Sequence, residues 1–96
     1  MTDQTEITLA HRVQRLDEVL FQNLDGEAVL LDLASETYFG LNEVGTRIWQ
    51  LIETAPPLSE VLSTLCAEFE ADAERIEDDL LALVGDLSKA GLVTVH

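Results

Sequence analysis

Residues 38–49 read YFGLNEVGTRIW, and the hydrophobic period of the chain changes within this stretch. Before Asn42 the residues are those of short strands joined by tight turns. After Asn42, apolar residues recur with the spacing of one helix face, at Val44, Ile48, Leu51 and Ile52. Asn42 is placed to cap the helix, and Glu43 favours its positive end. We therefore expect a strand that ends at Leu41 with an open hydrogen-bonding edge, and a later helix as the other wall of a groove beside it.

Two further strands are predicted upstream, Val19–Leu24 and Glu27–Leu33, joined by Asp25-Gly26. An Asp-Gly pair between two such runs is a strong hairpin signal, because a type I′ turn needs positive φ at both positions. A second turn at residues 34–36 leads into the third strand, Thr37–Leu41. The front half is therefore predicted to be a small antiparallel meander.

Three helices are predicted downstream. The first spans Glu43–Glu53 and is ended by Pro56-Pro57, the second begins near Ser59 as its cap, and the third spans Glu74–Ala90 with Gly91 as a left-handed C-terminal cap. The predicted class is α+β, a three-stranded antiparallel sheet followed by three helices in a winged helix-turn-helix arrangement.

The length predicts one domain. Ninety-six residues are too few for two cores, so we expect a flexible N-terminal arm over residues 1–16 and a domain over residues 17–96. Residues 92–95 have the composition of a short terminal strand.

The charge restricts the partners. Nineteen acidic residues against five basic ones give a net charge of -14, which disfavours nucleic acid and anionic membrane and attracts a cationic peptide. Within the third predicted helix, residues 74–90 hold five acids against two bases, which argues against DNA reading. The longest apolar run has five residues, far short of a membrane span. With one cysteine and no secretory signal, a cytoplasmic location is expected.

No catalytic constellation is found. His11 lies in the predicted arm, His96 is the last residue, and Cys66 follows Leu65 on a helix as a small buried filler rather than a nucleophile. We therefore expect no enzyme activity, no cofactor and no metal.

Three stretches carry a resemblance to a known family: LDGEAVLLDL at residues 24–33, YFGLNEVGTRIW at residues 38–49 and LSKAGLV at residues 87–93. Over residues 18–95 the chain resembles the PqqD family, peptide-recognition modules of enzymes that build ribosomally made, modified peptides. The resemblance implies that a leader peptide binds as an added strand along Thr37–Leu41, against the third helix, and that the module performs no chemistry itself.

The candidate peptide-binding residues follow from this placement. They are Thr37, Tyr38, Phe39, Gly40 and Leu41 on the strand, and Arg75, Asp78, Asp79, Leu81 and Ala82 on the helix. Successive strand residues face opposite sides, and we expect Phe39 inward and Tyr38 in the groove. Leu81 lies off the apolar stripe of the helix, which makes it a candidate pocket residue or a scattered exposed leucine.

Charged and glycine positions complete the prediction. Asp79 is the first candidate to meet a basic leader residue, and Arg75 an acidic one. Gly40 permits close backbone approach, although a bulge or turn explains it equally well. Gly45 within a helix indicates tight packing. For Trp49, core burial is favoured over a partner anchor.

The function expected is capture of a precursor's leader segment and its presentation to a maturation enzyme such as a leader peptidase, a cyclase or a radical enzyme, in a lasso-peptide, quinone-cofactor or related pathway. One alternative is an acidic carrier protein, which needs an Asp-Ser-Leu attachment site, whereas Asp86-Leu87-Ser88 has the wrong order. The other is a winged-helix regulatory protein, which the charge opposes.

Overall fold

The computed structural model describes residues 7–25 and 27–96. In chain order the elements are β1 (Val13–Arg15), β2 (Val19–Leu24), β3 (Glu27–Asp32), β4 (Thr37–Leu41), α1 (Glu43–Leu51), the 3₁₀ turn η1 (Ile52–Thr54), α2 (Leu58–Glu68), α3 (Ala73–Lys89) and β5 (Val93–Val95).

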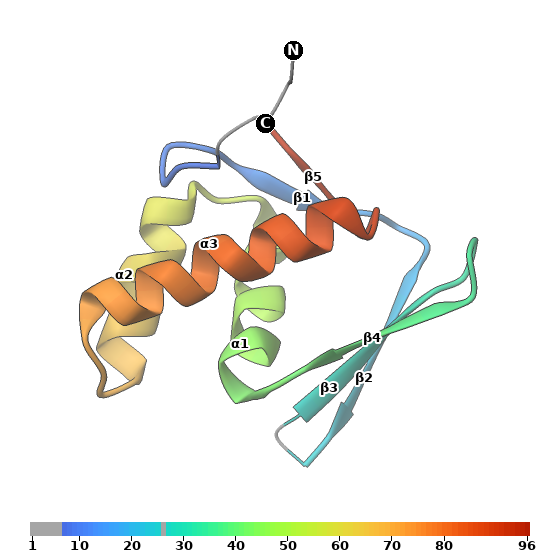
Figure 1. Cartoon of the computed structure of the whole chain (residues 1–96), viewed down its shortest axis with the longest axis horizontal. Coiled ribbons are helices and arrows are strands. Elements are labelled where there is room, and N and C mark those ends of the chain that lie inside the picture. The colour runs from blue at the N-terminus through green and yellow to red at the C-terminus, as the bar shows by residue number, and fades with distance from the viewer. Residues whose placement is uncertain (1–6, 26) are drawn as a thin grey trace.

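The predicted α+β class is confirmed. Strands β2, β3 and β4 form an antiparallel sheet in that order, and α1 packs on one of its faces, with α2 and α3 packed against α1 on that side (Figure 1). The side chains on that face of β3 are those of Ala28 and Leu30, which are 1% and 0% exposed. On the helix side, α3 contributes one stripe to the core beside buried residues of α1 and α2, and this stripe consists of Ile76, Leu80, Val84 and Leu87.

A second sheet joins the two ends of the described chain. Strand β1 pairs antiparallel with β5, with Val13 opposite Val95 and Arg15 opposite Val93. Val13 is fully buried, and Leu58 N–H and Ser59 N–H donate to the carbonyls of His11 and Leu9. The prediction of a flexible arm through residue 16 is therefore wrong for residues 7–16, because they pair with β5 and with the start of α2. The remainder of the predicted arm, residues 1–6, lies outside the described residues.

The strand-to-helix junction is as predicted. Strand β4 ends at Leu41, α1 begins at Glu43, and Asn42 Oδ1 accepts a hydrogen bond of 2.8 Å from Gly45 N–H. This bond satisfies one of the amides that a helix N-terminus leaves without an intrahelical partner.

Replacing the cap should destabilise the protein. We expect Asn42→Ala to lower the free energy of unfolding by about 1 kcal/mol, the typical value of an N-cap side chain. Urea unfolding followed by circular dichroism measures the change, with the slope against urea unaltered. An unchanged midpoint would show that the cap does not stabilise the junction.

Several predicted boundaries shift. Strand β3 ends at Asp32 rather than Leu33, because the Asp32 carboxylate accepts from Ala34 N–H at 3.1 Å and from the Ser35 hydroxyl at 2.9 Å and turns the chain. Helix α1 ends at Leu51 and continues as η1. The predicted cap Ser59 is wrong, since the N-cap of α2 is Pro57.

Other predictions hold. Trp49 is 2% exposed, and the guanidinium of Arg15 lies 5.0 Å from its ring centroid. Gly91 has φ 77°, the left-handed value expected of a cap that follows α3. Asp25 has φ 56°, as a type I′ turn needs, while Gly26 lies outside the described residues.

Candidate functional site

Strand β4 lies at the edge of its sheet. Among residues 7–25 and 27–96, β4 is paired with β3 alone, through a register that places Leu31 opposite Tyr38 and Val29 opposite Gly40. An edge strand presents backbone N–H and C=O groups at alternate residues to whatever lies beside it. The edge can therefore accept one more extended segment.

A groove lies beside the junction of this edge with α1. It has a volume of about 580 Å³ and opens between the β4–α1 junction and α3. The residues from the junction and α1 are Phe39, Gly40, Leu41, Asn42, Val44, Gly45 and Ile48, and those from α3 are Arg75, Asp79, Ala82, Leu83 and Asp86. A pocket of this size is in the range that binds side chains or small ligands.

The centre of the groove is apolar and tightly built. Val44 and Ile48 of α1 lie on one side, and Leu83 of α3 lies on the other. A Cβ added at Gly45 would lie 3.4 Å from Leu83 Cδ2 and 3.3 Å from both Leu41 Cδ2 and Asn42 Oδ1. The tight packing predicted at Gly45 is confirmed, because the missing side chain lets α3 approach the start of α1.

Two helical glycines give a matched test of this packing. Alanine is favoured over glycine in a helix by about 0.5–1 kcal/mol. At Gly85 of α3 an added Cβ would make an ordinary contact, 3.9 Å from Ile7 Cδ1. We expect Gly85→Ala to raise the free energy of unfolding by about that amount and Gly45→Ala to show no gain, because its methyl group meets three atoms at close distance. Equal gains in urea unfolding would contradict the packing role of Gly45.

Charged side chains flank the apolar centre. Arg75, Asp79 and Asp86 are exposed on the α3 wall, and within the described part of the chain none of the three makes an ion pair or a side-chain hydrogen bond. Among the described residues, an ion pair forms outside the groove, between Arg47 of α1 and Glu68 of α2. Its guanidinium lowers the pKa of the Glu68 carboxyl by hydrogen bonding. The three groove charges are therefore available to a bound segment.

The structure brings six of the ten predicted residues to the groove. These are Phe39, Gly40, Leu41, Arg75, Asp79 and Ala82. A Cβ at Gly40 would meet no atom within 4 Å, so no other part of the described chain approaches it closely. The expectation that Phe39 faces inward agrees with its half-buried position against the core.

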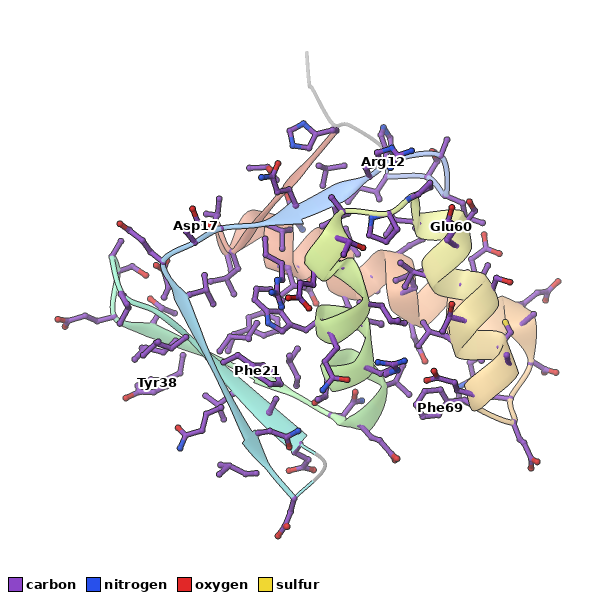
Figure 2. The ribbon with its side chains drawn as sticks, turned by 180° about the vertical axis from the view of Figure 1, so that it is seen from behind. Arg12, Asp17, Phe21, Tyr38, Glu60 and Phe69 are labelled. Atoms are coloured by element: carbon purple, nitrogen blue, oxygen red, sulfur yellow. The ribbon has the colours of Figure 1, made fainter. Side chains whose placement is uncertain are left out.

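Tyr38 lies on the opposite face of the sheet. Leu41 is buried and Phe39 half-buried, so strand alternation turns Tyr38 outward, where it is 70% exposed beside Leu31 and Leu33 (Figure 2). The expectation that it lines the groove is therefore wrong.

Leu81 is also placed elsewhere. It lies off the buried stripe, as the sequence predicts. However, side chains that are two positions apart on a helix point to nearly opposite sides, so Leu81 faces away from Leu83, which lines the groove. It shares its side of α3 with Gly85, which Ile7 approaches.

Two other predicted residues lie outside the groove. Asp78 is exposed on α3 but does not line the groove. Thr37 begins β4 near the turn, where its hydroxyl accepts from the Ser35 hydroxyl at 2.9 Å.

Sequence reasoning missed half of the groove residues: Asn42, Val44, Gly45 and Ile48 at the junction and on α1, and Leu83 and Asp86 on α3. Leu83 is only half-buried and forms the rim between core and groove. One signal could have found the two α3 residues. Arg75, Asp79, Leu83 and Asp86 are spaced by four, four and three residues and form a row along one side of α3.

Fold and groove together define a small α+β module with an open strand edge beside a partly apolar groove. The sequence matches the family described as coenzyme PQQ synthesis protein D (PqqD) over residues 27–93. The chain belongs to the PqqD family. Among the described residues no cluster of three metal-ligating side chains occurs, and no helix has the length and apolar character to cross a bilayer.

Two solved structures resemble the chain closely. The first is TbiB1 in complex with the TbiA(beta) leader peptide, with 38% sequence identity, a TM-score of 0.75, and coverage of 83% of this chain and 93% of that one. The second is a lasso peptide synthetase B1 complexed with the leader peptide, with 28% identity, a TM-score of 0.72, and coverage of 88% and 98%. No curated protein matches the chain.

Proposed function

We propose that this protein binds the leader segment of a ribosomally made precursor peptide and presents it to a maturation enzyme. The observation that carries the proposal is the unpaired edge of β4 beside a groove walled by α3. Support comes from the family and from the two similar structures, both of which are complexes with leader peptides.

The binding mode we propose is strand addition. A leader segment in extended conformation pairs its backbone with the outward N–H and C=O groups of β4, which supplies affinity with little dependence on sequence. Every second leader side chain then points toward α3, where an apolar one fits against Leu83 and Ile48. Asp79 and Asp86 favour a basic leader residue beside it, and Arg75 an acidic one.

The protein acts in this proposal as an adaptor without chemistry of its own. The similarity to a lasso peptide synthetase B1 favours a lasso-peptide pathway over a quinone-cofactor pathway. A cytoplasmic location belongs to the proposal as well, because precursor and leader are made there and the free Cys66 needs no oxidising compartment.

We also propose that the fold is a winged helix-turn-helix. This proposal is supported by the short connection between α2, which ends at Glu68, and α3, which begins at Ala73, with the β2–β3 hairpin in the position of a wing. DNA reading is not proposed, because α3 carries five acids against Arg75 and Lys89.

Binding of a labelled leader tests the function. The leader peptide of a candidate precursor, sought among the genes beside the one for this chain, is labelled with a fluorophore. It is titrated with the protein and followed by anisotropy, with a scrambled peptide of equal composition as control. We expect saturable one-to-one binding of the leader and at least about tenfold weaker binding of the scrambled peptide. Equal binding of both peptides, or of a DNA duplex in their place, would contradict the proposal.

A further inference from the structure

The outer face of the sheet, turned away from the helices, carries a row of large apolar side chains. Leu20, Leu31 and Tyr38 stand directly opposite one another on β2, β3 and β4, so their side chains project from the same face. Leu24 shares this face at the other end of β2, and Leu33 lies beside Leu31 and Tyr38. We call these five residues the outer patch.

The outer patch is open to solvent. Leu20 is 53% exposed, Leu24 54%, Leu33 49% and Tyr38 70%. The helices cover only the other face, where Leu30 and Ala28 are buried, and Figure 2 shows Tyr38 on the side of the sheet away from α1. Contiguous exposed apolar residues of this kind mark interaction sites, whereas single exposed leucines do not.

The charges around the outer patch indicate the chemistry of its partner. Residues 17–41, which include the whole sheet, contain six acidic residues and no lysine, arginine or histidine. Glu27 stands opposite Leu24 at one end of the patch, and Glu36 lies beside Leu33 and Tyr38 at the other end. A complementary surface is therefore apolar at its centre and rimmed by lysine or arginine.

These charges exclude two other occupants. A second copy of this chain, with the same acidic rim and a net charge of -14, would bring like charges together across the interface. An anionic bilayer would be repelled for the same reason.

We propose that the outer patch is the docking surface for the maturation enzyme that receives the leader, and that the enzyme meets it with an apolar patch rimmed by basic residues. The inference rests on the proposed function. It is supported by continuity with the leader site, because Tyr38 belongs to β4, so an enzyme seated on the patch lies directly beside a strand added to that edge.

The test separates the patch from the leader edge. Leu20 lies on β2, two strands away from the open edge of β4, and within the described chain it lines no pocket that contains groove residues, so Leu20→Asp changes the patch and leaves the leader site intact. Leu16→Asp is the matched control, since Leu16 is 40% exposed and lies outside the sheet. A second variant, Glu27→Lys/Glu36→Lys, reverses the rim charge and removes no apolar side chain.

The probe is a purified candidate maturation enzyme, sought among the genes beside the one for this chain, and its affinity is measured by calorimetry with and without leader. We expect Leu20→Asp to weaken enzyme binding at least about tenfold, with leader affinity unchanged and Leu16→Asp like the parent protein. The rim reversal should weaken enzyme binding and reduce its dependence on salt.

Four results would overturn the inference: no binding of the enzyme to the parent protein, unchanged enzyme binding in the patch variants, loss of leader binding in Leu20→Asp, or a parent dimer in sedimentation that this variant dissociates. If the parent protein fails to bind leader while the patch variants still lose the enzyme, the proposed function fails and the docking surface stands.

Discussion

Leu83→Asp should abolish most of the affinity for the leader while leaving the protein folded. Leu83 is the apolar side chain that α3 contributes to the centre of the groove, opposite Val44 and Ile48. Burial of one aliphatic side chain against it is worth about 1.5–3 kcal/mol, so its loss should weaken binding by roughly 10–150-fold. The carboxylate introduced at position 83 would also lose its hydration when an apolar leader residue packs against it, which lowers the leader affinity further. Anisotropy titration of the labelled leader measures the change.

Leu81→Asp is the control for this variant. Leu81 is half-buried on the same helix, as Leu83 is, and the chemical change is identical, but its side chain faces away from the groove. We expect both variants to lose similar free energy of unfolding and only Leu83→Asp to lose leader affinity. Equal loss of affinity in both would mean that the groove between β4 and α3 is not the binding site.

Methylation of the leader's backbone nitrogens, one at a time, should weaken binding at every second residue. If the leader adds to β4 as a strand, alternate leader amides donate to β4 carbonyls and the intervening amides point away. Methylating a donating nitrogen removes a hydrogen bond worth about 0.5–1.5 kcal/mol and places a methyl group inside the inter-strand spacing of about 4.8 Å. We expect at least about tenfold weaker binding at those positions.

The methylated peptides that serve as controls are those changed at the intervening nitrogens. These peptides have the same composition and the same restricted backbone, but their methyl groups point away from β4, so their affinity should stay close to that of the parent leader. Sensitivity at every position, or at none, would show that the leader does not bind as an added strand.

What the sequence predicted correctly was encoded locally. The change of period at Asn42, with its cap, fixed the end of β4 and the start of α1 to the residue. The Asp25-Gly26 turn located the β2–β3 hairpin, and Gly91 located the end of α3. Each of these signals depends on a few neighbouring residues and on their own φ angles or hydrogen bonds.

What the sequence did not predict depends on contacts between distant segments. Strand β1 has three residues and pairs with β5 about 80 positions away, so no local period marks it. A helical projection places Leu81 and Leu83 on nearly opposite sides of α3, but it does not give the neighbour that each one meets. Ile7 near one side of α3, and the β4–α1 junction on the other, decide that Leu83 lines the groove and Leu81 does not.

Whether the open edge of β4 accepts the leader is tested most directly by nuclear magnetic resonance. Nitrogen-15-labelled protein is titrated with unlabelled leader, and the backbone amide signals are followed. We expect the amide signals of Thr37–Leu41 to shift together with those on the groove side of α3. Alternate amides of β4 should also become protected from hydrogen exchange. Shifts confined to α1 or to the leucines of the outer patch, with Thr37–Leu41 unchanged, would contradict strand addition at this edge.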